Sequence, residues 1–239
     1  MRKDFTAGIR AGVPVCLGYF SVSFGFGVMA VSKGLNPWDA ILISLSNLTS
    51  AGQFAGLNVI VAGAALIEMI LTQLVINSRY ALMSVALGQK LGPKVGTGKR
   101  LAMAFFNTDE VFALGMTRLG KLSPAFFLGA GLIAALGWTA GTALGAAAGA
   151  VLPLSVRLAL GTMLYGMFIA IVIPQIRTEK TLLFPVLISV LLSSAFYYLP
   201  LLSEISSGIA MTICAVVAAV FGALVFPVKP EEQEDEARE

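Results

Sequence analysis

Residues 124–150 read PAFFLGAGLIAALGWTAGTALGAAAGA, a run of 27 residues without a charged side chain. A helix that crosses a bilayer needs about 20 predominantly apolar residues, so this stretch predicts a membrane-spanning helix. Glycine recurs in it at every fourth position, at Gly137, Gly141, Gly145 and Gly149. Small residues at this spacing let a neighbouring helix approach closely. The stripe therefore predicts a packing face, used either inside a helical bundle or between the subunits of a homodimer.

Further apolar segments surround this run. Hydrophobic residues make up 57% of the 239-residue chain and charged residues only 12%, about half the charged share of a soluble domain. We expect an all-α, polytopic transmembrane bundle with broken helices and about seven spans, give or take one. A single transmembrane transporter domain would cover residues 1–230, ahead of an acidic disordered tail at 231–239. The other apolar segments are 8–32, 38–62, 63–88, 99–117, 156–175, 181–200 and 207–227.

Charge is unevenly distributed along the chain. The tail holds six of the 13 acidic residues and one of the 16 basic ones, which leaves 15 basic against seven acidic residues before it. Basic loops of a membrane protein explain this excess, so we expect lipid rather than nucleic acid as a partner. The densest basic loop is 90–100. This loop lies on the other side of the membrane from the N-terminus if every apolar segment crosses the membrane. It lies on the same side as the N-terminus if one segment within 38–88 is re-entrant.

The chain has no histidine and two widely separated cysteines, Cys16 and Cys214. Serine–histidine and cysteine–histidine catalysis and histidine-based zinc sites are thereby excluded. We expect neither an enzyme nor a bound metal or cofactor.

The first polar constellation inside an apolar segment is Asn47-Leu-Thr49-Ser50-Ala-Gly-Gln53. Ser50 and Gln53 have the spacing of a capping box, which predicts a helix that breaks near Ser50 and restarts at Ala51. The free amides and positive dipole end of a restarted helix suit a carboxylate ligand. The alternative is that these small residues only ease helix–helix contact.

The second constellation is Asn107-Thr108-Asp109-Glu110. Four consecutive residues cover about 300° of a helix, so no orientation hides them all from lipid. Asn107 followed by Glu110 resembles a helix start, and two carboxylates in an apolar segment are candidates for function by default. Without histidine, a coupling proton would need a carboxylic acid. The alternative is that both acids are wet at the membrane surface.

Glu68 and Arg79 are further charged residues in an apolar segment. They share a helix face but lie about 16 Å apart along a straight helix, so they cannot pair. Asn77 lies beside Gln73 on the other face. Arg79 either snorkels to the basic loop or joins Asn77 in a functional group.

A weak internal repeat relates residues 116 positions apart, namely Gly25 with Gly141 and Pro37 with Pro153. Many transporters carry such duplications with the site between the halves, and an odd number of spans per offset would make the repeats inverted. In a glycine-rich chain the coincidence can also arise by chance.

Several blocks together resemble a known family over residues 6–227, the AzlC-like large subunit of branched-chain amino acid exporters. The chain departs from the family pattern at Ser23, where proline is expected, and at Tyr165–Phe168, where an acidic pair is expected. The blocks are Ser23-Phe-Gly-Phe-Gly27, Ser50-Ala-Gly-Gln-Phe-Ala55, Val75-Ile-Asn-Ser-Arg-Tyr80, Asn107-Thr-Asp-Glu110 and Gly166-Met-Phe168.

The resemblance implies secondary export of leucine, isoleucine and valine, extending to methionine, across the inner membrane. It also implies a small AzlD-like membrane subunit as partner. A channel or uniporter for another small solute is the alternative function, and an assembly subunit or an intramembrane enzyme are weaker ones.

We expect the substrate carboxylate near the amides that follow Ser50, with Gln53 and Asn77 orienting it. Asp109 or Glu110 would meet the ammonium group or carry the coupling proton. The remaining candidate substrate-binding residues are Asn47, Arg79 and an apolar wall of Phe24, Phe26, Phe54 and Phe168.

Overall fold

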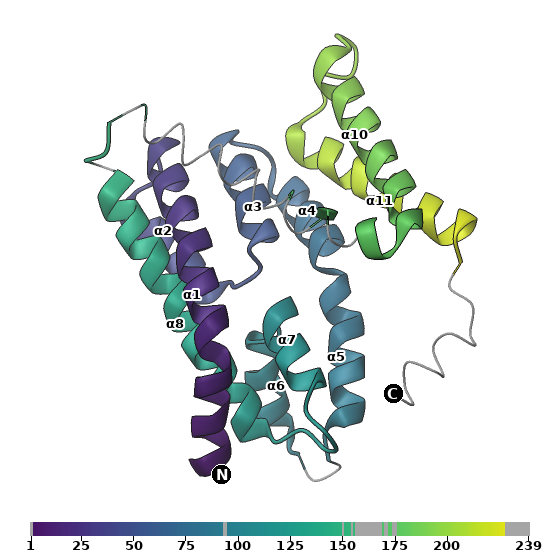
Figure 1. Ribbon diagram of the computed structural model, residues 1–239. Coiled ribbons are helices and arrows are strands. Elements are labelled where there is room, and N and C mark those ends of the chain that lie inside the picture. The colour runs from purple at the N-terminus through teal and green to yellow at the C-terminus, as the bar shows by residue number, and fades with distance from the viewer. Residues whose placement is uncertain are drawn as a thin grey trace.

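The computed structural model describes residues 2–92, 95–149, 151–153, 155, 169, 172–173 and 176–227, apart from the side chain of Ser207. Every regular element in this part of the chain is a helix, which confirms the all-α prediction (Figure 1). The expected segment 156–175, with Phe168 and the Tyr165–Phe168 block, lies largely outside the described residues. The elements are α1 (Arg2–Ser32), α2 (Pro37–Ser46), α3 (Ala51–Val61), α4 (Leu66–Asn77), α5 (Arg79–Lys90), α6 (Thr97–Phe105), α7 (Asp109–Met116), α8 (Pro124–Gly149), the 3-10 turn η1 (Lys180–Leu182), α10 (Leu183–Tyr198) and α11 (Ser207–Val225).

The glycine stripe of α8 packs inside the chain, against α1. A Cβ on Gly145 would lie 2.1 Å from the carbonyl oxygen of Phe24, and one on Gly141 would lie 2.3 Å from that of Phe20. Any side chain at these positions would force the two backbones apart. The stripe therefore serves the contact between α1 and α8 and not a homodimer interface.

Helices α1 and α8 run parallel to each other. Near the start of both helices, a Cβ added to Gly8 would meet the backbone of Phe126. Near their ends, a Cβ added to Gly149 would meet the backbone of Val28. Both helices therefore cross the membrane in the same direction, which constrains the path of the chain between them.

The segment 37–61 enters the membrane and returns to the same face. Helix α2 starts four residues after Lys33, and the Lys33 ammonium group donates a hydrogen bond of 2.7 Å to Asn58 near the end of α3. Both ends of the α2–α3 pair therefore lie beside the C-terminal end of α1, as Figure 1 also shows. The pair is a re-entrant helical hairpin, which was one of the two topologies left open by the sequence.

Helices α4 and α5 form one broken span. Their axes differ by 43° across Ser78, which is a bend and not a reversal. At the far end of α5 the Lys90 carbonyl accepts a hydrogen bond of 3.0 Å from the Leu122 amide, close to the start of α8. The span therefore ends on the same side as the N-terminus of α1.

The segment 97–116 is a second re-entrant hairpin, which enters from this opposite face. The ammonium group of Lys90 donates a hydrogen bond to the carbonyl of Met116, the last residue of α7. Helix α6 starts seven residues after Lys90, so both ends of the α6–α7 pair are near the end of α5 (Figure 1).

Five of the expected segments are therefore spans in the described part of the chain. Four helices, α1, α8, α10 and α11 (with α10 counted from Lys180), are long and apolar enough to cross, and the α4–α5 pair makes the fifth. This count is lower than the expected seven because the segments 38–62 and 99–117 return to their own side, and because segment 156–175 lies largely outside the described residues.

The basic residues orient the molecule. Within the described residues up to Gly149, Lys33 lies at the other face and Arg79 at mid-span, whereas the remaining basic residues cluster at the face where α1 begins. Lys and Arg gather in cytoplasmic loops, so we infer that this face is the cytoplasmic one. The clustered residues are Arg2, Lys3, Arg10, Lys90, Lys99, Arg100, Arg118 and Lys121.

An internal duplication is visible, but at a different offset from the expected one. A span followed by a re-entrant hairpin occurs twice. In residues 2–61 the span is the continuous helix α1, and in residues 66–116, which run in the opposite direction, it is the broken α4–α5 span. The expected repeat, which pairs residues 116 positions apart, relates α1 to α8. Because these two helices are parallel, that repeat is not inverted. The part of that relation that follows Pro153 lies mostly outside the described residues.

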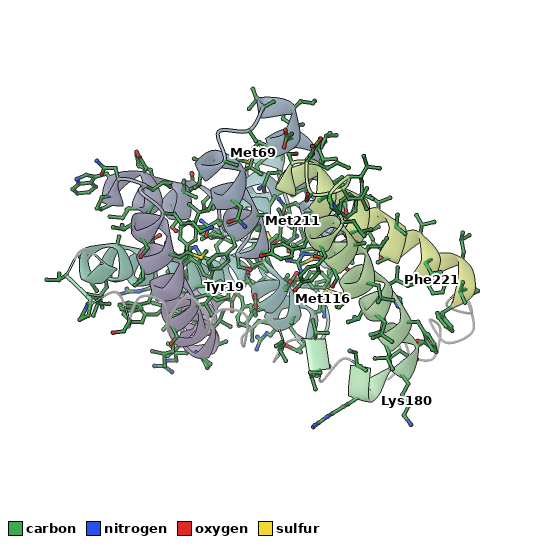
Figure 2. All side chains as sticks on the ribbon, turned by 90° about the horizontal axis from the view of Figure 1, so that it is seen from above. Tyr19, Met69, Met116, Lys180, Met211 and Phe221 are labelled. Carbon is green, nitrogen blue, oxygen red and sulfur yellow. The ribbon has the colours of Figure 1, made fainter. Side chains whose placement is uncertain are left out.

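Helices α10 and α11 form a peripheral pair. Helix α11 packs on α4 and α3, and α10 packs on α11. The Thr72 hydroxyl donates a hydrogen bond of 3.2 Å to the Gly208 carbonyl across this contact. Lys180 and Phe221 mark the side of this pair that faces away from Tyr19 (Figure 2).

Candidate functional site

The tips of the two hairpins meet the bend of the α4–α5 span in the middle of the bundle. Helix α3 begins at one tip and α7 at the other, so two helix N-termini with free amides lie at this level. All three polar constellations found in the sequence interrupt helices here. Discontinuous helices with polar breaks at the midplane are typical of substrate sites in transporters.

The tip of the α2–α3 hairpin breaks where the sequence predicted. Helix α3 restarts at Ala51, and Ser50 before it has a φ of 27° and a ψ of −79°. A positive φ in a residue with a side chain is strained and persists only where its surroundings enforce it. The predicted capping box is wrong, because the Ser50 side chain makes no cap hydrogen bond. Instead, Asn47 Oδ1 accepts a hydrogen bond of 3.0 Å from the Thr49 amide.

Gln53 ties this tip to α8. Its Nε2 donates to the Asn47 carbonyl at 2.7 Å and to the Ser44 hydroxyl at 3.3 Å. Its Oε1 accepts a hydrogen bond of 2.8 Å from the indole N–H of Trp138. With 2% of its surface exposed, Gln53 is a structural junction whose donors and acceptor already have protein partners. Ser44 continues the network to Thr142 at 2.7 Å.

The tip of the α6–α7 hairpin carries the two carboxylates in the first turn of α7. The residue that precedes the helix is Thr108, without a side-chain cap, so the predicted start at Asn107 is wrong by one residue. Asn107 Nδ2 instead donates a hydrogen bond of 3.2 Å to the Ser84 hydroxyl of α5. Asp109 and Glu110 lie in the first turn of α7, at the positive end of its helix dipole.

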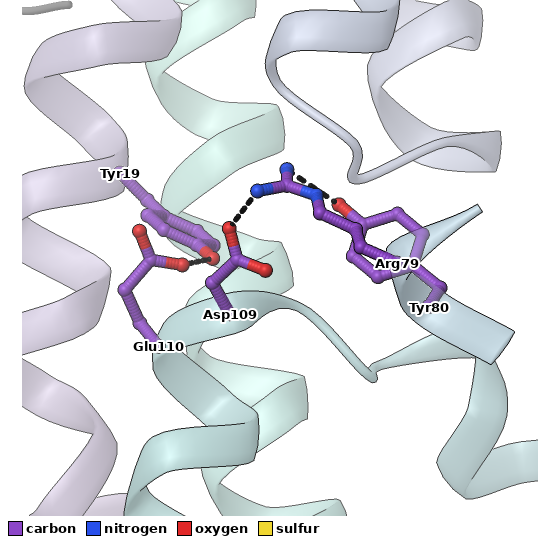
Figure 3. Close-up of polar contacts among 5 residues, drawn as sticks. All are labelled: Tyr19, Arg79, Tyr80, Asp109 and Glu110. Atoms are coloured by element: carbon purple, nitrogen blue, oxygen red, sulfur yellow. Dashed lines mark hydrogen bonds and ion pairs between the residues drawn. The ribbon is translucent and has the colours of Figure 1, made fainter. Parts of the chain in front are cut away.

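Asp109 forms an ion pair with Arg79, the first residue of α5 (Figure 3). The Arg79 guanidinium also lies over the ring of Tyr80, 5.1 Å from its centroid. Arg79 therefore does not snorkel to the basic loop but stays at the break of the span. The two side chains are 43% and 44% exposed, so this pair lies open in the isolated chain.

Glu110 accepts a hydrogen bond from the hydroxyl of Tyr19 on α1 (Figure 3). The Tyr19 ring packs edge-on against Trp138, with 5.2 Å between the ring centroids. Tyr19 thereby joins the carboxylate of one hairpin tip to the indole that holds the other.

Two chains of contacts thus connect the same two hairpin tips. The first, which we call the Arg79 arm, runs from Asp109 through Arg79 and the bend to Asn77. From there Asn77 Nδ2 donates to Gln73 Oε1 at 2.9 Å, and Gln73 Nε2 donates to the Gly52 carbonyl at 2.8 Å.

The second chain, the Tyr19 arm, runs from Glu110 through Tyr19 and Trp138 to Gln53. The arms start on adjacent residues of α7 and end on adjacent residues of α3. The two tips are therefore connected by two continuous routes of side-chain contacts.

Buried acceptors at this level lack partners among the described residues. They are Asn77 Oδ1 on the Arg79 arm and Thr49 Oγ1, Asn107 Oδ1 and Thr108 Oγ1 at the hairpin tips. A buried polar atom without a partner is costly, so these positions suit a ligand that brings hydrogen-bond donors.

The expected phenylalanine wall is only partly assembled around the site. Phe26 and Phe54 pack edge-on, with 5.3 Å between the ring centroids, inside a core cluster that joins α1, α2 and α3. Phe24 is half-buried on α1, and Phe168 lies outside the described residues.

The sequence did not single out Tyr19 or Trp138 as site residues. Each is an aromatic residue with a polar end within a long apolar segment, and such a residue needs a buried hydrogen-bond partner. That need was a usable signal, but the partner could not be named without the fold. No cluster of three or more acidic or thiol side chains in the described part of the chain could hold a metal ion.

A family model described as "AzlC protein" matches residues 14–152, which is more than half of the chain and includes both hairpins. The chain belongs to the AzlC family. The fold and the site described above are therefore those of an AzlC-family, multi-pass membrane protein.

Two similar proteins are named as membrane proteins. The AzlC-family chain is 27% identical to the Inner membrane protein YgaZ of Escherichia coli over 74% of its own length and 76% of that protein. It is 31% identical to an uncharacterized membrane protein of Archaeoglobus fulgidus over 72% of its length and 76% of that protein. No solved structure matches it.

Proposed function

We propose that this AzlC-family protein is a secondary transporter that exports branched-chain amino acids across the inner membrane. The observation that carries the proposal is the meeting of two opposed re-entrant tips at an open Arg79–Asp109 ion pair, in the middle of an apolar bundle. Opposite charges held at a discontinuity match the two ends of a zwitterion.

In this proposal the ammonium group of the substrate is received by Asp109 and Glu110, and by the unpartnered oxygens of Asn77 and Asn107. Its carboxylate binds at the N-terminal amides of α3 after Ser50 and at Arg79. The substrate thereby competes with the Arg79–Asp109 pair, so binding opens the Arg79 arm. Gln53, whose polar atoms are engaged, positions the α3 tip and does not touch the substrate. Either carboxylate of α7 can carry the coupling proton.

The aliphatic side chain of the substrate would lie against Phe24 and Phe54, and against Phe168 beyond them. One methylene changes binding in such an apolar pocket by only about 1–3 kcal/mol, so leucine, isoleucine and valine would share the site, with methionine as a further substrate. Resemblance to the family supports a small AzlD-like membrane subunit as the partner.

A channel or uniporter is the second candidate, because two half-helices that meet end to end could also form a filter. Counterflow separates the two functions. A carrier accelerates efflux of labelled leucine when unlabelled leucine is present on the other side, whereas a channel does not.

The test is efflux of preloaded leucine from cells that express the full chain together with an AzlD-like subunit. Asp109→Asn and Arg79→Gln should each lower the initial rate at least tenfold. Asp39→Asn, at an exposed carboxylate in the first turn of α2, is the matched control and should leave the rate within twofold. Normal rates in Asp109→Asn and Glu110→Gln, at two external pH values, would show that the carboxylates have no role.

A further inference from the structure

We propose that a pocket between α5 and α6 is a second ligand site, which binds an aliphatic carboxylate at the cytoplasmic face. The pocket has a volume of about 230 Å³ and is lined by residues of both helices. It lies outside the two arms of the central site.

The walls of the pocket are mainly apolar. Three of the lining side chains are buried: Leu87, Leu91 and Met103 have 4%, 8% and 1% of their surface exposed. Burial of short aliphatic groups against such a wall is favourable in proportion to the area removed from water. A branched side chain of four or five carbons fits this volume.

Arg100 provides the charge of the pocket. Its Nε donates a hydrogen bond of 3.0 Å to the Val95 carbonyl, and its Nη1 lies 3.7 Å from the position of a Cβ on Gly88, another lining residue. The Nε bond uses one of the five donors of the guanidinium and holds the group at the pocket. The terminal N–H groups are suited to a carboxylate, which arginine binds in a bidentate manner.

The lining contains no acidic residue, in contrast to the central site with Asp109 and Glu110. The pocket therefore selects for a carboxylate and an aliphatic group and does not require an amine. This difference separates its ligand chemistry from that of the central site.

The pocket extends toward the central site. It runs along α6 from Thr97 to Ala104, about 10 Å at the helical rise per residue. Ser84, which lines it, accepts the hydrogen bond from Asn107 at the tip of the α6–α7 hairpin. Given the proposed export function, on which this role rests, the pocket is a vestibule from which a cytoplasmic amino acid reaches the tip.

The test uses 4-methylpentanoate, which has the isobutyl and carboxylate groups of leucine but no amine. Its binding to the full-length chain in phosphatidylcholine nanodiscs is measured by saturation-transfer NMR. We expect saturable binding that weakens at least fivefold in Arg100→Gln. Lys99→Gln, the neighbouring cation outside the pocket lining, is the matched control and should stay within twofold. Ala104→Leu, which fills the pocket and keeps all charges, should also weaken binding at least fivefold.

Two results would overturn the inference. The first is that the probe does not bind, or that its binding is weakened by neither Arg100→Gln nor Ala104→Leu. The other is loss of binding when phosphatidylglycerol is added to the nanodiscs, which would make the pocket a site for an anionic lipid. The measurement needs no transport, so a chain that binds the probe but fails to export leucine would refute the export function alone.

Discussion

The hydrogen bond between Gln53 and Trp138 should be one of the most strongly coupled contacts in the protein. Gln53→Leu removes three hydrogen bonds at a position that is 2% exposed. Intramembrane hydrogen bonds contribute about 0.6 kcal/mol each on average, so the three together contribute about 2 kcal/mol. The indole N–H of Trp138, itself 1% exposed, is left without its partner, which costs about 1–3 kcal/mol more. We expect Gln53→Leu to lower the free energy of unfolding by about 3–5 kcal/mol.

A double-mutant cycle tests the reasoning. Trp138→Phe removes the indole donor and keeps an aromatic ring against Tyr19. In the double variant no buried N–H is orphaned, so its cost should be smaller than the sum of the single costs by about 1–3 kcal/mol.

The free energies are measured by SDS titration of the purified chain, followed by circular dichroism. Asn58→Leu on the same helix is the control, since the Asn58 side chain accepts its hydrogen bond from Lys33 in an exposed contact, and it should cost no more than about 1 kcal/mol. Additive costs in the cycle would show that the α3 tip is not held by this bond.

Three further predictions concern packing, topology and the Tyr19 arm. Gly145→Ala should lower the free energy of unfolding by about 1–3 kcal/mol, because the added methyl group overpacks the α1–α8 contact. Gly25→Ala is the control: nothing lies within 4 Å of its added Cβ, so it should raise the thermal midpoint slightly. Equal effects of the two substitutions in melting assays would contradict the α1–α8 packing. Single cysteines at Gly96 and at Leu119, which is 99% exposed, test the topology in a background without the native cysteines. Both should react with a membrane-impermeant maleimide added at the cytoplasmic face and not with the same reagent added at the other face. Labelling of the two positions from opposite faces would exclude the re-entrant α6–α7 hairpin. Tyr19→Phe should slow leucine efflux severalfold. It should lower the free energy of unfolding by no more than about 1 kcal/mol, because the ring contact with Trp138 is kept. An unchanged efflux rate would show that the Tyr19 hydroxyl has no role in transport.

Local sequence was a good guide to where helices break. The restart at Ala51 was predicted from Ser50 and Gln53, yet Gln53 does not cap the helix and instead bonds to Trp138, 85 residues away. Spacing reports which residues can meet along one helix, whereas a partner on another helix depends on packing.

Arg79 shows the same limit. The spacing correctly excluded a pair with Glu68, because the rise of a helix is set locally. It could not supply Asp109, which lies 30 residues further along the chain and reaches Arg79 only because the α6–α7 hairpin turns back at this level.

The sequence by itself determined the all-α membrane class, the positions of the apolar segments and the residues at which two of them are interrupted, because apolar length and polar breaks are local properties. The break of the α4–α5 span at Ser78 was not predicted. Tertiary structure decided the direction of the chain after each break. The α4–α5 span continues with a bend, whereas α2–α3 and α6–α7 reverse, and the same kinds of residues occur at all three breaks. A break frees the backbone to turn, but which turn is stable depends on the surfaces it then meets. The close approach of α1 and α8 and the two arms that join the hairpin tips supply those surfaces.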